Sequence, residues 1–160
     1  MPTTRFEFLP TLRELVRTYQ AFDAFSGSHI RTLGLTTPQF DVIATLGNTQ
    51  GMNCRDIGQK TLMVKGTLTG VLDRLEQKGL IIRISHPTDG RSTLVRLSPV
   101  GEELFARVFS AHLAHLEPVF ALLGRETLET LRQHLEQLRH SLEKQSDPSS
   151  DQEDFSRERR

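Results

Sequence analysis

The side chains best suited to chemistry lie between positions 65 and 74, and they offer hydrogen-bond donors to nucleic acid. Ammonium, guanidinium and hydroxyl groups donate to phosphate oxygens and base edges, and glycines leave room for a close approach. Each glycine also costs a helix about 1 kcal/mol relative to alanine, which a purely structural helix has little reason to accept. The candidates are Lys65, Gly66, Thr67, Thr69, Gly70 and Arg74.

A second group of candidates lies in a predicted hairpin. Asp89-Gly90 is a hairpin-turn signal between two strand-like segments, residues 80–85 and 93–97. Arg91 lies at the tip of this hairpin, where a guanidinium can enter the narrow minor groove of a duplex. We therefore add Asp89 and Arg91 to the predicted nucleic-acid contacts.

The charge distribution supports a nucleic-acid surface in a chain whose formal net charge is zero. Residues 53–98 carry eight basic and four acidic side chains, whereas residues 99–160 carry eight basic and twelve acidic ones. A locally basic segment can bind phosphate although the whole chain is neutral. Asn53, at the start of this segment, can cap a short helix predicted over 55–61 and is a further candidate contact.

No combination of residues indicates catalysis. The sequence contains no glycine-rich phosphate loop, no G-x-S-x-G motif and no H-E-x-x-H pair. We therefore expect neither an enzyme nor a cofactor. A protein-interaction scaffold, in which the same segment binds a partner protein, is the alternative from a different functional class.

Apolar periodicity predicts the elements that position these side chains. A first amphipathic helix carries apolar residues at alternating steps of four and three, namely Phe8, Leu12, Leu15, Tyr19 and Phe22. Further helices are predicted over 38–46, 55–61, from after Val64 to Lys78, 99–123 and 126–144. The two threonines and the proline at 36–38 predict a hydroxyl cap and a first-turn proline at the start of the helix over 38–46. Gly79 is predicted to end the helix after Val64, and Ser98 to cap the helix over 99–123. Pro118 should kink or interrupt the helix over 99–123. The last helix has leucines spaced three and four apart, which is typical of a coiled-coil-like seam.

The predicted fold is mainly α with a small β-hairpin wing. Helix, turn, helix and hairpin form a winged helix-turn-helix domain over residues 36–98, in which the second helix enters the major groove. We expect helical dimerisation regions over 1–35 and 99–144. The tail over 145–160 is rich in Ser, Asp, Glu and Arg, and we expect it to be disordered.

Composition predicts a cytoplasmic protein without a membrane partner. No stretch approaches the roughly 20 apolar residues that span a bilayer, and the N-terminus lacks the pattern of a signal peptide. Cys54 is the single cysteine, so an internal disulfide is excluded.

The order of the motifs resembles the multiple antibiotic resistance regulator (MarR) family. The chain contains DRLEQKGLI at 73–81, Arg83, PTDGRS at 87–92 and LSPVG at 97–101. In that family these motifs recur together, and the resemblance extends to about Lys144. The family often has a second arginine where this chain has glycine between Asp and Arg of the wing.

This resemblance implies a transcriptional regulator, in the first place a repressor. It implies a homodimer, joined through the N- and C-terminal helices, on a pseudo-palindromic double-stranded DNA operator. Family members commonly respond to small aromatic or phenolic acids, which implies a small-molecule effector. Candidate effector contacts, among which His29 or Arg31 suits a carboxylate, are Tyr19, Phe22, Phe25, His29, Arg31 and Phe40. Aromatic residues at helical spacing are also typical of a core, and this alternative stays open.

Redox and zinc sensing are the remaining alternatives within the family. Cys54 lies at a predicted helix N-terminus, which favours the thiolate, but the redox branch carries its cysteine in the first helix. We therefore expect an inert Cys54.

His112 and His115 lie one helical turn apart and can bind Zn²⁺ with a third ligand such as His29 or Glu117. The zinc-sensing branch, however, places an acidic residue and a histidine where this chain has Gln and Phe at 39–40. We expect solvent-facing histidines and no metal site.

Overall fold

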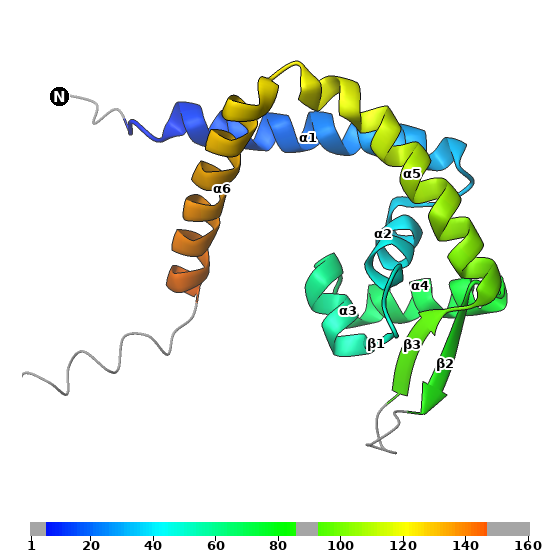
Figure 1. Cartoon of the computed structure of the whole chain (residues 1–160). Coiled ribbons are helices and arrows are strands. Elements are labelled where there is room, and N and C mark those ends of the chain that lie inside the picture. Colours follow the sequence, from blue (N-terminus) through cyan, green and yellow to red (C-terminus); the bar gives the residue numbers. More distant parts are fainter. Residues whose placement is uncertain (1–5, 86–92, 147–160) are drawn as a thin grey trace, which may run out of the picture. The chain divides into compact units, whose positions relative to one another are not determined.

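Figure 1 shows a mostly helical protein with a small sheet, as the sequence predicts. The computed structural model describes residues 6–85 and 93–146, and the chain forms two compact units, Met1–Leu116 and Glu117–Arg160. The first unit contains α1 (Leu9–Thr32), α2 (Thr37–Leu46), β1 (Met52–Asn53), α3 (Cys54–Thr61), α4 (Lys65–Gln77), β2 (Ile81–Ser85), β3 (Thr93–Leu97) and most of α5 (Pro99–Ala121). The second unit contains the end of α5 and α6 (Gly124–Ser146). Among the described helices, none is long and apolar enough to cross a membrane.

Side-chain caps begin α2 and α3 where the sequence predicts them. Thr36 Oγ1 accepts a hydrogen bond from Gln39 N at 3.4 Å, and Gln39 Oε1 accepts one from Thr36 N at 3.1 Å. At the start of α3, Asn53 Oδ1 accepts from Asp56 N at 2.8 Å. These side chains satisfy amide groups that have no partner inside the helix. The caps therefore fix where the helix-turn-helix begins.

The sheet has three antiparallel strands, one more than the predicted hairpin. β3 pairs with β2, with Leu97 opposite Ile81, and its other edge pairs with β1, where Val95 lies opposite Met52. Gly51 permits this approach because its φ is +110° and a Cβ there would lie 3.0 Å from the Val95 carbonyl oxygen. A two-residue strand shows no alternation, which is why apolar periodicity did not predict β1.

The core of the first unit lies between α2, α3, α4, the sheet and the first half of α5. Its ten largest side chains with less than 2% exposure are Ile30, Val42, Ile43, Leu46, Ile57, Leu72, Leu75, Ile81, Val95 and Val108. α4 buries one face at the predicted spacing, through Leu68, Val71, Leu72 and Leu75. Truncating such a leucine to alanine typically costs about 2–5 kcal/mol. Because these side chains anchor one face of α4 in the core, the opposite face of the helix points away from the core.

The end of α4 and the start of α5 share a hydrogen-bonded joint. Gly79 adopts φ +69°, as expected for a residue that ends a helix. Ser98 Oγ donates to Gly79 O at 2.6 Å and accepts from Gly101 N at 3.0 Å, and Ser98 N donates to Leu80 O at 3.0 Å. A Cβ at Gly101 would lie 2.0 Å from Leu80 O, so only glycine fits this approach.

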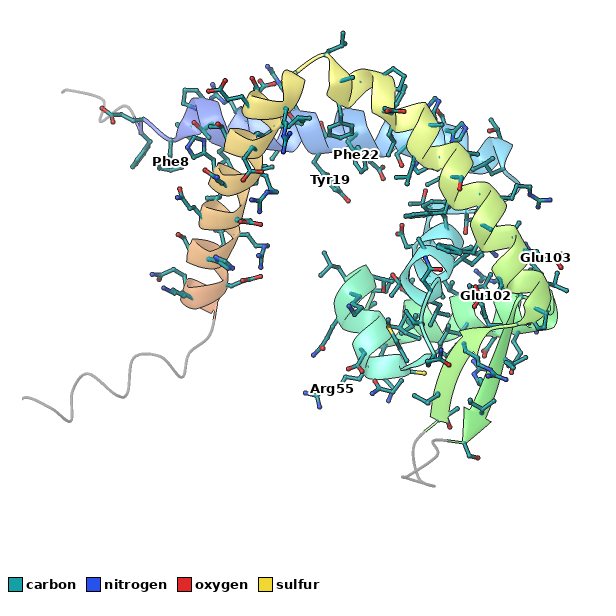
Figure 2. The ribbon with its side chains drawn as sticks, in the orientation of Figure 1. Phe8, Tyr19, Phe22, Arg55, Glu102 and Glu103 are labelled. Carbon is teal, nitrogen blue, oxygen red and sulfur yellow. The ribbon has the colours of Figure 1, made fainter. Side chains whose placement is uncertain are left out.

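Apolar side chains of α1 lie on the surface of the first unit. The exposed residues include most of the predicted stripe, and Leu15 is half-buried. Those with the largest exposed surface on α1 are Phe8, Leu12, Val16, Tyr19, Phe22 and Phe25. This helix therefore presents an apolar face that the described chain leaves open (Figure 2).

The helices of the second unit differ from the prediction in two details. Pro118 lies inside α5, which continues to Ala121, so the predicted interruption does not occur. α6 runs to Ser146, slightly past the predicted end at Lys144, and the segment 147–160 lies outside the described residues.

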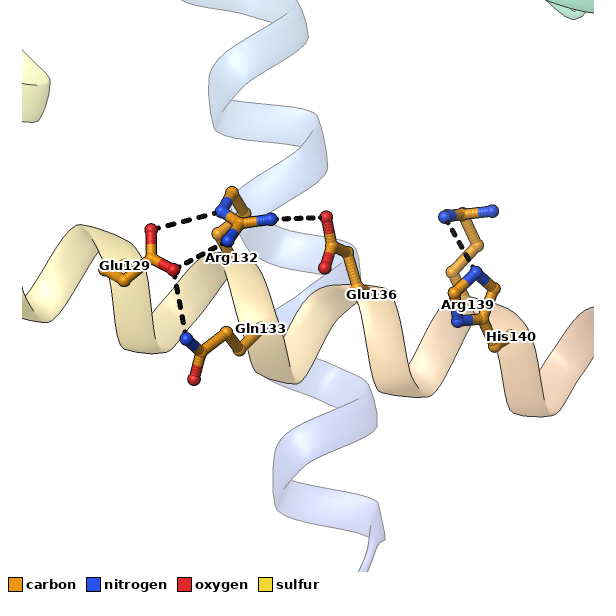
Figure 3. Close-up of polar contacts among 6 residues, drawn as sticks. All are labelled: Glu129, Arg132, Gln133, Glu136, Arg139 and His140. Carbon is orange, nitrogen blue, oxygen red and sulfur yellow. Dashed lines mark hydrogen bonds and ion pairs between the residues drawn. The ribbon is translucent and has the colours of Figure 1, made fainter.

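Two strips run along α6. Exposed leucines form the α6 leucine stripe, which consists of Leu131, Leu135, Leu138 and Leu142. A neighbouring strip holds ion pairs, in which Arg132 contacts Glu129 and Glu136, each at 2.6 Å (Figure 3). Arg139 pairs with Glu143 at 2.9 Å. Such pairs stabilise a helix by a few tenths of a kcal/mol each, roughly 0.2–0.5, without any need to cover its leucines.

Candidate functional site

The outward face of α4 consists of small residues flanked by hydrogen-bond donors. Gly66 and Gly70 are separated by about one helical turn and lie opposite the buried leucines. A Cβ added at either glycine would meet no described atom within 4 Å. The packing of the protein therefore does not require these glycines. They leave a strip of backbone that a large ligand can approach closely.

Two cations border this strip. Lys65 and Arg74 are exposed, and within the described residues neither forms an ion pair. Thr67 is exposed beside them, whereas Thr69 Oγ1 donates to Lys65 O at 2.9 Å. The Thr69 hydroxyl can therefore still accept a hydrogen bond from a ligand, but its proton is already used. The predicted residues of α4 thus share one accessible surface.

The carboxylates of α4 are neutralised from the sheet. Arg83 of β2 donates to Asp73 Oδ1 at 2.7 Å, and its other terminal nitrogen donates to Glu76. The hydrogen bond to Asp73 is the main cause that raises the pKa of Arg83 above its ordinary value. Arg83 therefore ties the base of the wing to α4 and offsets negative charge beside the donor surface. Sequence reasoning did not assign Arg83 a contact, because its partners lie ten and seven residues earlier, across a helix end.

The first residues of α3 contribute to the same region in different ways. Both polar atoms of the Asn53 side chain are hydrogen-bonded to Asp56. Oδ1 accepts from Asp56 N, and Nδ2 donates to Asp56 Oδ2 at 3.0 Å. Its contact with nucleic acid stays a prediction. Arg55 is exposed and projects from α3 on the side away from α1 (Figure 2). Sequence reasoning overlooked it, although a cation two residues after a cap belongs to the basic segment. Cys54 is exposed.

A groove of about 700 Å³ separates α3 from α4. It is lined by Cys54, Arg55, Gly58, Gln59, Leu62, Met63, Val64, Lys65, Leu68, Thr69 and Leu72. Leu62 has φ +57° and is 89% exposed, and Val64 is 72% exposed. Exposed apolar side chains next to basic ones suit the methyl group of thymine beside a phosphate. The predicted wing residues Asp89 and Arg91, and Gly90 between them, lie outside the described residues.

The structure separates the predicted effector residues into two sets. Tyr19 and Phe22 lie exposed along α1 (Figure 2), and Arg31 is exposed further along the same helix. Phe25, His29 and Phe40 instead come together with two residues of α5. The effector role of either set stays a prediction.

Five rings form a continuous series, which we call the ring column: Phe25, His115, His29, His112 and Phe40. The Phe25 ring stacks on His115 at 4.4 Å between centroids, and His115 stacks on His29 at 4.0 Å with planes 5° apart. His29 Nδ1 and His112 Nδ1 are hydrogen-bonded at 3.0 Å, and Phe40 meets His112 edge-on at 4.8 Å. The column connects α1, α5 and α2.

Among the described residues, the buried side-chain nitrogens of the column are paired, with one exception. His112 is 4% exposed and its Nε2 is hydrogen-bonded to Ser26 Oγ at 3.1 Å. His115 Nε2 is buried without a hydrogen-bond partner. The expectation of solvent-facing histidines is therefore wrong for His112 and incomplete for His115. Sequence reasoning named His29 as a possible third ligand beside these two histidines, and the structure places its imidazole next to both of theirs.

Burial and mutual repulsion disfavour the charged forms of His29 and His112. Burial is the main cause that lowers the pKa of His112 and of His29, and the neighbouring imidazoles lower both pKa values further. Among the described residues, no three His, Cys, Asp or Glu side chains are arranged to hold a metal ion.

Comparison with known proteins identifies similar sequences. The model of the MarR family matches residues 35–93. The HTH-type transcriptional regulator MhqR of Bacillus subtilis is 32% identical over 124 residues, which cover 78% of this chain and 86% of MhqR.

Solved structures with the same fold include complexes. The repressor CouR bound to a 23-mer DNA duplex has a TM-score of 0.69 and 26% identity, and the match covers 79% of this chain and 89% of CouR. NadR in complex with 4-hydroxyphenylacetate has a TM-score of 0.72 and 24% identity, with 86% of this chain and 97% of NadR covered. The fold therefore occurs both in a protein bound to DNA and in one bound to an aromatic acid.

Proposed function

The chain belongs to the MarR family of transcriptional regulators, and from this premise we propose that it is a cytoplasmic, homodimeric repressor with a pseudo-palindromic operator. A small aromatic or phenolic acid would release it from that operator. The protein acts by binding and carries out no reaction.

The observation that carries this proposal is the uncovered face of α4. Gly66 and Gly70 leave a strip without side chains, bordered by the exposed Lys65 and Arg74, which form no ion pair within the described residues. The major groove admits a helix whose outer residues contact base edges, and cations beside it contact phosphates. Arg55 would add a phosphate contact from α3. The DNA complex of CouR supports the same use of this fold.

Exposed apolar side chains on two helices support the proposed dimer. The α1 face and the α6 leucine stripe are exposed, and burial of apolar surface contributes about 25 cal/mol per Å². Two copies joined through these helices would place two α4 helices on half-sites about 34–36 Å apart, one turn of the duplex. The twofold axis of the dimer would then match the pseudo-palindrome of the operator.

An effector acts only through a difference in affinity between two conformations. Its proposed location is the region of Phe25, His29 and Phe40, because there α1 and α5 meet α2, which packs on α4 in the winged domain. A ligand that changes the position of α1 and α5 relative to α2 changes the separation of the two recognition helices. NadR, which has this fold, binds an aromatic acid.

The test is operator binding by the full-length protein. Fluorescence anisotropy would compare a labelled duplex from the promoter upstream of its own gene with a random duplex of equal length, at several salt concentrations. We expect tighter binding to the promoter duplex, a steep loss of affinity with salt, and a footprint of two half-sites. Equal affinity for both duplexes would contradict the proposal and favour the protein-interaction scaffold.

A further inference from the structure

We propose that the ring column is the receptor for the acidic group of the effector, which binds at His115 Nε2 and brings one proton into the column. This inference rests on the proposed function, because it requires an acidic effector. It assigns a residue that sequence reasoning did not include among the effector contacts, and it makes effector affinity depend on pH.

The first argument is the unsatisfied nitrogen. His115 Nε2 is buried without a hydrogen-bond partner, although the other polar contacts around it are made. Buried polar atoms in folded proteins nearly always have a partner, so an orphaned one is a candidate point for a ligand atom or an ion to bind. A protonated imidazole donates from both nitrogens, so an anionic oxygen is the partner that would satisfy Nε2 best.

The second argument is the proton capacity of the column. The bond between the Nδ1 atoms of His29 and His112 needs one proton between two nitrogens. His112 Nε2 can either donate to Ser26 Oγ or accept from it, so both tautomers of the neutral pair are satisfied. One additional proton on His29 keeps this bond, whereas protonation of both Nδ1 atoms would place two N–H groups against each other. The pair therefore takes up one proton and resists a second.

The third argument is the absence of a counter-charge in the part of the chain that the structure describes. The causes that lower the pKa of His29 and His112 are burial and the other imidazoles, and no carboxylate contributes. The acidic residues of the helices that pack around the column are Glu14 and Asp23 on α1, Asp41 on α2 and the exposed Glu102, Glu103 and Glu117 on α5. Burial is the main cause that raises the pKa of Asp41, and repulsion from Asp23 raises it further.

The charged basic groups nearby are equally few. Arg31 follows His29 on α1 but is exposed, and its side chain lies near Gly27, while Arg107 of α5 is exposed one turn before the column. An anion that arrives at His115 would therefore be the only negative charge in contact with the imidazoles, and it would favour their protonated form. Without a ligand, burial and the neighbouring imidazoles disfavour the charged forms of His29 and His112, whereas a bound anion would favour a positive charge opposite it.

The two phenylalanines of the column provide an aromatic contact for the ligand and a way into the column from the surface. Phe25, at the outer end, is 38% exposed and covers His115, so a small displacement of this ring would admit a flat ligand. At the inner end Phe40 is 7% exposed and belongs to α2. The column thus connects a surface-accessible ring with the helix that packs against the winged domain.

The experiment is titration calorimetry of the full-length protein with phenylacetate and with its neutral isostere phenylacetamide. Measurements in phosphate and in Tris, which differ in ionisation enthalpy, give the number of protons taken up. We expect about one proton per bound phenylacetate, and an affinity that rises by up to tenfold for each unit of pH decrease between pH 8 and 6.5. Phenylacetamide should bind more weakly and without proton uptake.

Two variants test whether proton uptake depends on the nitrogen of His115. His115→Phe keeps a ring for stacking but removes the nitrogen, and it should lose proton uptake and most of the preference for the acid. His134→Phe, an exposed histidine of α6, is the matched control and should behave like the original protein.

Three results would overturn the proposal: no binding of phenylacetate, binding without proton uptake, or unchanged uptake in His115→Phe. Operator binding, measured in the same preparations, separates this failure from failure of the proposed function. A protein that binds its promoter duplex and releases it with phenylacetate, but takes up no proton, would keep the function and refute the role of the column.

Discussion

Replacing Gly70 by alanine should stabilise the protein and weaken its binding to DNA. Alanine is favoured over glycine in a helix interior by about 1 kcal/mol, and a Cβ at this position would meet no described atom within 4 Å. The full gain should therefore appear in the free energy of unfolding. For a chain of this size it corresponds to a rise in Tm of about 2–4 °C.

The loss in DNA binding arises because the methyl group occupies the space that the glycine keeps open. A displacement that costs about 0.7–1.4 kcal/mol at each of two half-sites lowers operator affinity by about tenfold to 100-fold. Differential scanning fluorimetry gives the first quantity, and anisotropy of a labelled operator gives the second. Opposite signs in the two measurements are the signature of a glycine that is retained for a ligand rather than for packing.

Gly27→Ala is the matched control. A Cβ at Gly27, in α1, would face the protein, 3.3 Å from Thr37 Oγ1 and 3.4 Å from Arg31 Nη1. This variant should change stability while it leaves operator affinity within about twofold of the original. If Gly70→Ala binds the operator as tightly as the original protein, the close approach of DNA to α4 is refuted.

Three other predictions concern the sheet, the dimer and pH. Arg83→Met leaves two carboxylates on the flank of α4 uncompensated and should weaken operator binding by about threefold to tenfold, whereas unchanged anisotropy titrations would show that the ion pairs do not position the wing. Leu135→Glu places a charge in the α6 leucine stripe, and sedimentation velocity should show a monomer; a persistent dimer would exclude this stripe from the interface. Folded His29 and His112 have pKa values below the ordinary 6.5, so the unfolded chain binds more protons and stability falls as pH drops below about 6.5. Thermal unfolding at fixed protein concentration should show this decline, by at most about 1.4 kcal/mol per pH unit for each histidine, and a shallower one in His29→Phe.

Local signals predicted most of the fold because each depends on a few neighbouring residues. The hydroxyl and proline at 36–38 indicated the start of α2, and the capping box confirms it. Gly79 and Ser98 were predicted as the end of one helix and the start of the next, and both have these roles. Such features need only the chemistry of a helix end.

The features that sequence reasoning missed depend on residues far apart in the chain. His112 is paired with His29 and Ser26, which lie 83 and 86 positions away, so the spacing of histidines along α5 gave no indication of its burial. The role of Arg83 depends on the angle at which β2 leaves α4, and β1 consists of only two residues. Tertiary contacts of this kind have no period in the sequence.

The joint at Ser98 has a mechanical consequence. The Ser98 hydroxyl is hydrogen-bonded to Gly79, just after α4, and to the first turn of α5. Because Gly101 has no side chain, the two backbones lie in close contact. The end of α4 and the start of α5 are therefore fixed to each other, so that a rotation of α5 about this joint would also move α4. A ligand that displaces α5 would thus displace α4 as well, and no segment between the two helices would have to unfold.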